Sequence, residues 1–281
     1  MADSTRRGVR QFALWLGEEV NSWFGDKPFS DGGQVSHGRL SVRLRWQEDD
    51  GLDTNVRFRA RFDLPNLRDK AYIFFGHENE RELIADQPEA FTEEQLLTES
   101  RSGDQTGFLG IGFNLHDYLD FRTGVRGGWK LYSQVRYRRQ WLLSAKNRAE
   151  FGETVFWRIN DGFGSTTRFT LEHAQTESLS FKWQNSATTT KETDGFAWSS
   201  SVGPFKTFSN NRLLSLEVLT NGETGSKDSI HEYGARLKWR QPVYRDWLLL
   251  DLIVGHFWPK GEEEPERRKY WAASTGLMMH F

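Results

Sequence analysis

The stretch Asn55–Leu64, NVRFRARFDL, decides the fold class because its alternation is strict. Apolar residues occupy one set of alternate positions and charged residues the other: Val56, Phe58, Ala60 and Phe62 against Arg57, Arg59, Arg61 and Asp63. Successive side chains of a β-strand point to opposite faces of its sheet. The stretch therefore predicts a strand with one apolar face and one face that carries a row of arginines.

The same alternation continues from about residue 34 almost to the C-terminus, and it predicts about 14 strands. Twelve is the alternative count, because short runs are easily miscounted. Tight connections such as LHDYL alternate with longer polar ones such as QNSATTTKETDG, and the longest covers residues 77–106. Short turns at one end and long loops at the other are typical of a membrane barrel. We expect the long connections to be exposed surface loops.

The composition narrows the class of protein. The formal net charge is −2, which argues against a general binder of nucleic acid. Cysteine is absent from the sequence, so disulfides and thiolate metal sites are excluded. The mean hydropathy of −0.69 excludes a transmembrane helix but not a membrane barrel, whose strands need only about 10 residues of alternating character.

Residues 9–24, VRQFALWLGEEVNSWF, have helical instead of two-residue spacing and predict a short amphipathic helix. We therefore divide the chain into an N-terminal segment, residues 1–33, and a barrel, residues 34–281. The helix could lie on the membrane surface, plug the interior or dock a periplasmic partner. Its aromatic content favours the membrane surface or a partner, because a plug would desolvate charged interior groups.

The C-terminal residues STGLMMHF resemble the last strand of the bacterial outer-membrane β-barrel class. In that class a polar residue, a glycine and spaced apolar residues ending in an aromatic form the signal that the barrel-assembly machinery reads. The matching positions are Ser274, Gly276, Met279 and Phe281, with methionine in place of the more usual aromatic residue at 279. The resemblance implies an all-β, single antiparallel transmembrane barrel in the outer membrane, with both termini in the periplasm.

Arginine facing lipid at the bilayer centre costs about 2–4 kcal/mol, so the arginines of the opening stretch are expected inside the barrel. The same parity applied to every strand predicts a set of pore-lining, solute-binding cations: Arg43, Arg45, Arg57, Arg59, Arg61, Arg122, Arg136, Arg138, Arg148, Arg158, Arg168, Lys182, Arg236, Lys238 and Arg240. Fewer acids fall on inward positions, so the interior is expected to be positive. One strand, residues 148–159, conflicts with the scheme because its parity puts Glu153 toward lipid, and a bulge or a wrong boundary would remove the conflict.

An arginine-lined, water-filled pore favours anions, so the sequence predicts a passive channel for small acidic solutes or oligosaccharides. The interior resembles in chemistry that of small barrels that pass acidic sugars, although no motif is shared. Two alternatives stay open. Arginines and glutamates on neighbouring strands could pair and fill the interior, which leaves a closed scaffold barrel that docks a periplasmic partner through residues 9–24.

The other alternative is a barrel enzyme that acts on lipid or peptide. Its best group of residues is His77 with Glu78 and Glu80, near His256, and we assign no catalytic role from it. No His/Asp/Glu cluster shows ligand spacing, so neither metal nor cofactor is expected. The expected partners are outer-membrane lipid, the assembly machinery and an acidic solute, without nucleic acid.

Overall fold

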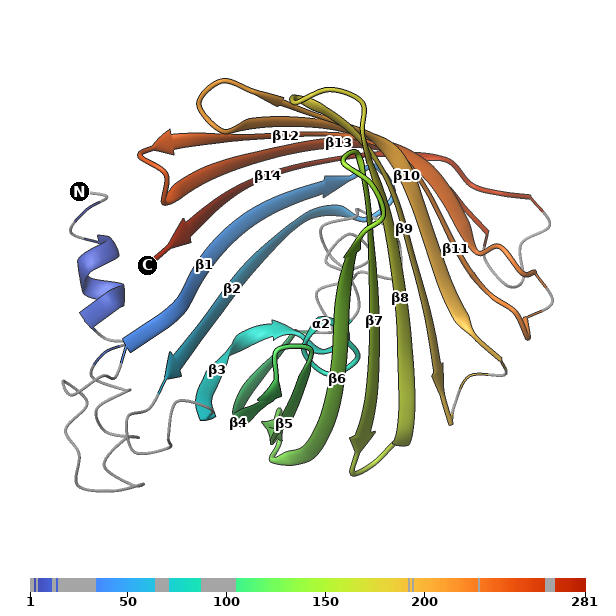
Figure 1. Cartoon of the computed structure of the whole chain (residues 1–281). Coiled ribbons are helices and arrows are strands. Elements are labelled where there is room, and N and C mark those ends of the chain that lie inside the picture. Colours follow the sequence, from blue (N-terminus) through green and yellow to red (C-terminus); the bar gives the residue numbers. More distant parts are fainter. Residues whose placement is uncertain are drawn as a thin grey trace, which may run out of the picture.

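The computed structural model describes residues 3, 5–11, 14, 34–63, 71–86, 105–191, 193, 195–226, 228–260 and 266–281. These residues form one closed antiparallel barrel of 14 strands (Figure 1). The predicted fold class and strand number are confirmed, and the alternative count of 12 is wrong. Each strand pairs with its sequence neighbours, and β1 pairs with β14 to close the barrel.

With the exception of the eight-residue strand Leu119–Arg126, the strands are long enough to cross a bilayer at a tilt, which takes about 9–11 residues each. Their bounds are β1 (Gln34–Gln47), β2 (Gly51–Asp63), β3 (Ala71–Asn79), β4 (Gln105–His116), β5 (Leu119–Arg126), β6 (Lys130–Leu142), β7 (Asn147–Arg158), β8 (Gly162–Ala174), β9 (Leu179–Thr190), β10 (Ala197–Phe208), β11 (Arg212–Glu223), β12 (Glu232–Tyr244), β13 (Leu248–Pro259) and β14 (Tyr270–His280). A four-residue helix, α2 (Glu80–Leu83), follows β3.

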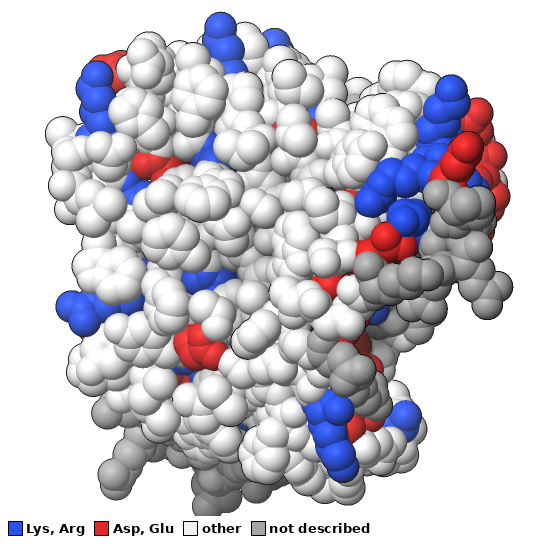
Figure 2. Space-filling view, turned by 90° about the vertical axis from the view of Figure 1, so that its right-hand side faces the viewer, with Lys and Arg blue, Asp and Glu red and all other residues white. Residues whose placement is uncertain are grey.

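The outer face of the wall is apolar. Val56 is 49% exposed on this face, whereas its neighbour Arg57 is buried on the inner face. Large apolar side chains are also exposed on the other strands, among them Val42, Leu44, Leu216, Val218, Leu237, Leu252, Val254 and Leu277. On the side drawn in Figure 2, uncharged side chains cover most of the surface. So large an apolar surface suits lipid and not water.

Tryptophans complete this outer surface. Trp46 and Trp271 are each about half exposed, and they lie at the ends of their strands, where indole rings favour the membrane interface. Within the part of the chain that the structure describes, no helix is both long and apolar enough to cross a membrane.

Glu153 lies on the outer face of β7, and neither a bulge nor a wrong boundary is the reason. The β6–β7 and β7–β8 pairings run without a register shift, so the alternation holds through the strand. The carboxylate accepts hydrogen bonds from the outward hydroxyls of Ser165 and Thr167, the latter at 2.6 Å. Both proposed explanations were wrong, and local hydrogen bonds partly compensate for the exposed charge.

Helical residues at the N-terminus begin earlier than predicted. Residues 5–11 are helical, whereas the sequence predicted a helix over 9–24. Arg6 donates to the carbonyl of His280 on β14 and lies over the ring of Trp247, and Leu14 packs near Phe62. Apart from residues 9–11 and 14, the predicted helix lies outside the described residues.

The C-terminal ring is seated against β1 and β2. Phe281 donates its backbone N–H to the carbonyl of Gly38 at 3.1 Å, and its ring stacks on Phe58 at a centroid distance of 6.0 Å. A Cβ atom at Gly38 would lie 2.3 Å from the Phe281 ring. A larger residue at position 38 would therefore require the Phe281 ring to move.

We expect Gly38→Ala to displace the Phe281 ring and to destabilise the barrel by about 1–3 kcal/mol, the usual cost of overpacking. The measurement is the unfolding temperature in detergent, monitored by the difference in gel mobility between the folded and the unfolded barrel. Gly107→Ala is the matched control, since the nearest atom to its added Cβ lies 4.0 Å away. Equal unfolding temperatures for the two variants would contradict the prediction.

Candidate functional site

The strand register places the predicted cations on inward positions of the wall. Arg43, Arg57, Arg122, Arg136 and Arg236 are buried there, although they are cationic. Charged groups this deeply buried are normally paired. The distribution of carboxylates therefore decides what the interior can bind.

The connection after β3 enters the barrel instead of extending outward, which corrects the expectation of a surface loop for this part of residues 77–106. Residues 79–86, called here the inward segment, begin at Asn79, whose side chain caps α2 by accepting from the N–H of Arg81 at 2.8 Å. In Figure 1, α2 lies inside the ring of strands.

Apolar contacts anchor the inward segment to the wall. Leu83 and Ile84 are each 1% exposed. They belong to a cluster with inward aromatic side chains of the wall: Tyr72, Phe74, Phe108, Tyr132 and Phe156. Gln134 also donates from Nε2 to the carbonyl of Leu83 at 3.2 Å. Burial of this kind stabilises each large side chain by about 1.5–3 kcal/mol, so the segment is held independently of its charges.

The acids of the inward segment meet arginines of the wall. Glu80 pairs with Arg126 and, at 3.1 Å, with Arg158. Glu82 pairs with Arg57 at 3.0 Å. Two of the predicted pore-lining arginines, Arg57 and Arg158, together with Arg126, thus contact carboxylates of a connection that was expected to lie outside the barrel.

Glu78, the inward residue of β3 just before this segment, is shared by two arginines. Its two carboxylate oxygens lie 3.1 Å from Arg39 and 3.2 Å from Arg59. The Glu78 side chain is 1% exposed, whereas that of Arg59 is 35% exposed. Arg59 therefore still faces open space inside the barrel.

Asp86, the last residue of the inward segment, lies among guanidiniums of β6 and β8. It contacts Arg138, and it lies 2.9 Å from Arg168 and 3.6 Å from Arg136. Burial alone would raise the pKa of Asp86, but these three positive charges outweigh it and hold the pKa well below its usual range. The Asp86 side chain is accordingly a carboxylate at neutral pH.

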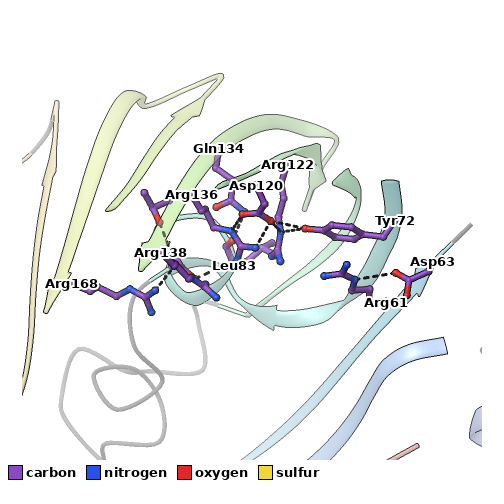
Figure 3. A network of polar contacts seen from close by, with 12 residues as sticks. Arg61, Asp63, Tyr72, Leu83, Asp120, Arg122, Gln134, Arg136, Arg138 and Arg168 are labelled. Atoms are coloured by element: carbon purple, nitrogen blue, oxygen red, sulfur yellow. Dashed lines mark hydrogen bonds and ion pairs between the residues drawn. The ribbon is translucent and has the colours of Figure 1, made fainter. Parts of the chain in front are cut away.

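A second carboxylate, Asp120 of β5, extends this network along the wall (Figure 3). Arg136 donates to it through two nitrogens, at 2.6 and 2.5 Å, and Arg122 donates at 3.2 Å. The hydroxyl of Tyr72 donates to Asp120 at 2.7 Å and accepts from Arg122 at 2.7 Å. The network fixes the orientation of both arginines.

Cations outnumber carboxylates in this network. Among the described residues, four guanidiniums, those of Arg122, Arg136, Arg138 and Arg168, directly contact two carboxylates, which is an excess of two positive charges. An excess of fixed positive charge within a restricted, partly dry space attracts anions.

A cavity of about 600 Å³ opens beside this network, at the end of the barrel where β1 begins and β14 ends. Arginines dominate its polar lining, together with two histidines and two carboxylates: Arg39, Arg59, Arg61, Arg122, Arg138, Arg168, His37, His280, Glu82 and Asp86. A volume of this size accommodates a small organic solute.

The opposite wall has the same ratio of charges, because four described cations contact two carboxylates. Arg236 and Glu217 form a pair at 2.9 Å, and Asp251 is shared by Arg240 at 2.6 Å, Lys238 at 3.7 Å and Arg43 at 3.8 Å. Such pairs between neighbouring strands are what the closed-interior alternative requires. Ion pairs therefore line both walls of the interior that the structure describes.

No protein-family model and no curated protein sequence matches the chain. Among solved structures, OprB from Pseudomonas putida aligns with a TM-score of 0.50 at 8% identity, covering 90% of this chain and 94% of that chain. An anion-selective porin from Comamonas acidovorans has a TM-score of 0.47 at 10% identity, with 89% and 100% coverage. The KdgM porin has a TM-score of 0.42 at 9% identity, with 86% and 99% coverage.

The fold is that of an outer-membrane porin. At these identities the similarity concerns the fold alone, so what this porin-like barrel binds has to be argued from its own side chains.

The histidines of the enzyme alternative do not come together in this porin-like barrel. His77 and Glu78 are successive residues of β3 and point to opposite faces of the wall. His256 lies on β13 between Trp258 and Trp271, and β14, β1 and β2 separate it from β3. In the described ranges, no group of three His, Cys, Asp or Glu side chains could hold a metal ion.

The inward segment and its carboxylates were not predicted from the sequence. A usable signal was present, because Leu83, Ile84 and Ala85 form an apolar run in a largely polar connection, directly between Glu82 and Asp86. An apolar run in a long loop has to be buried somewhere, and the barrel interior is the nearest dry surface.

Proposed function

We propose that the protein is a channel of the bacterial outer membrane for passive, anion-preferring passage of small acidic solutes or oligosaccharides. The supporting observation is the arginine-lined cavity, in which the guanidiniums around Asp86 and Asp120 outnumber the carboxylates. Arginine suits this role because its planar fork binds carboxylate or phosphate through two parallel hydrogen bonds and keeps its charge.

The membrane setting belongs to the same proposal. The apolar outer wall would contact outer-membrane lipid, both termini would lie in the periplasm, and Ser274, Gly276, Met279 and Phe281 would form the signal for the assembly machinery. The cavity at the terminal end of the barrel would then open toward the periplasm.

A closed scaffold barrel is the second candidate, and the paired groups around Asp251 favour it. Its periplasmic partner would dock through residues 9–24. Loss of a co-purifying protein when these residues are deleted, together with absence of conductance, would support this candidate over the channel.

We expect the triple variant Arg57→Ala, Arg59→Ala, Arg61→Ala to lose anion preference in planar bilayers. Removal of these inward cations leaves Glu82 and Glu78 with fewer positive partners, so the interior becomes more negative. The measurement is the reversal potential in a salt gradient, and the chloride-to-potassium permeability ratio should fall to unity or below.

The matched control replaces three cations outside the interior, Arg139, Lys206 and Arg212, by alanine. It changes the net charge equally and should keep the wild-type reversal potential. A silent bilayer from well-folded wild-type protein would overturn the channel, and an unchanged ratio in the inward triple variant would overturn the anion preference.

A further inference from the structure

Asp86 lies where the inward segment meets the cavity. Its carboxylate lines the cavity beside Arg138 and Arg168. The Arg138 side chain is 45% exposed, whereas the Asp86 side chain is 10% exposed, so the guanidinium faces the open space and its partner lies behind it. A solute that enters the cavity therefore meets a cation whose existing partner is a carboxylate of the protein.

The position of Asp86 does not depend on its charge. The three residues before it, Leu83, Ile84 and Ala85, are buried in the aromatic cluster of the wall. Thr154 also donates a hydrogen bond to Asp86 at 3.3 Å, which an amide oxygen at the same place could accept. Neutralising Asp86 should therefore leave the inward segment in place and change only the charge that the arginines meet.

We propose that Asp86 is a resident counter-ion, which the carboxylate of an entering acidic solute replaces at Arg138 and Arg168, so that Asp86 sets the affinity of the channel for its solute. This inference rests on the proposed channel function and deepens it. The exchange conserves charge, because one carboxylate takes the place of another on the same guanidiniums. A carboxylate is the chemical class indicated, since the site already holds one.

Competition between Asp86 and the solute for the same arginines would be useful in a channel. Conduction requires binding strong enough for the solute to enter and weak enough for it to leave. Without a competing carboxylate, a pair of partly desolvated arginines would hold an acidic solute tightly, because charge-assisted bidentate hydrogen bonds are the strong ones. Asp86 lowers that affinity without removing the positive charge that attracts the solute.

The experiment compares wild type with Asp86→Asn. Detergent-solubilised protein is titrated with glucuronate by calorimetry, and the same preparations are measured in planar bilayers for conductance and for block by glucuronate. We expect Asp86→Asn to bind glucuronate about tenfold more tightly, a difference of about 1.4 kcal/mol, and to release it more slowly.

Two controls separate the role of Asp86 from a general change in charge. Asp86→Glu keeps the carboxylate and should bind glucuronate as wild type does. Asp228→Asn removes a carboxylate that pairs with Lys260 outside the barrel wall, and it should also match wild type. Unchanged gel mobility of the folded barrel verifies that each variant has assembled.

The outcomes distinguish this inference from the channel itself. Equal or weaker glucuronate binding by Asp86→Asn, with a conducting wild type, overturns the counter-ion role and leaves the channel standing. A wild type that neither conducts nor binds glucuronate overturns the proposed function and the inference with it.

Discussion

Replacing Leu83 and Ile84 together by aspartate is expected to release the inward segment and to raise the single-channel conductance severalfold. Each side chain is 1% exposed among aromatic residues of the wall. Loss of such a side chain costs about 2–5 kcal/mol, and a carboxylate in its place adds the cost of an unpaired buried charge. A second measurement is tryptic cleavage after Arg81, which becomes accessible once α2 has left the interior.

The control for this experiment is the pair Leu83→Met and Ile84→Val, which keeps the site apolar and should preserve wild-type conductance and resistance to trypsin. Unchanged conductance in the aspartate variant, with Arg81 still protected, would show that the segment is held by its ion pairs alone or does not narrow the passage.

We also expect Arg236→Met to destabilise the barrel by about 3–5 kcal/mol, because it leaves the buried carboxylate of Glu217 without its cationic partner. The side chains of Arg236 and Glu217 are 3% and 2% exposed and lie 2.9 Å apart. The hydroxyl of Ser215 also donates to Glu217, at 2.9 Å. Unfolding in urea, with folded barrel measured by gel mobility, gives the change in free energy.

The double variant Arg236→Met, Glu217→Leu tests whether the unpaired Glu217 carboxylate causes the loss of stability. Removal of both charges eliminates the unpaired carboxylate, so most of the stability should return. A single variant as stable as wild type, or a double variant no more stable than the single one, would show that an unpaired Glu217 carboxylate does not destabilise the barrel.

The architecture could be predicted from the sequence because each strand carries its own signal. In Asn55–Leu64 the alternation of Val56, Arg57 and Phe58 specifies both a strand and the side on which the arginines lie, without reference to any distant residue. The C-terminal pattern ending in Phe281 gave the class of barrel. Glu153 also lies on the outer face, as the alternation predicts, whereas its hydrogen-bond partners on β8 could not be predicted from the sequence.

The arrangement of the interior could not be predicted in the same way. Alternation assigns Arg57, Arg138 and Arg168 to the inside, but it says nothing about a connection that turns inward after β3. The pairs Glu82–Arg57 and Asp86–Arg168 join residues far apart in the sequence, and only the closed barrel brings them together. The carboxylates of the inward segment therefore neutralise part of the positive charge that the alternation predicts for the interior.

The depressed pKa of Asp86 keeps this one carboxyl group charged in mildly acidic as well as in neutral surroundings. A carboxyl group whose pKa is lowered on folding contributes stability above its unfolded pKa, about 3.9, and loses that contribution only as the pH falls through the lower folded value. Between pH 7 and pH 4, acidification would leave Asp86 ionised and its ion pairs intact. Asp86 would thus remain the partner of Arg138 and Arg168 in an acidified medium, and a change in the charge of the cavity would come from its two histidines.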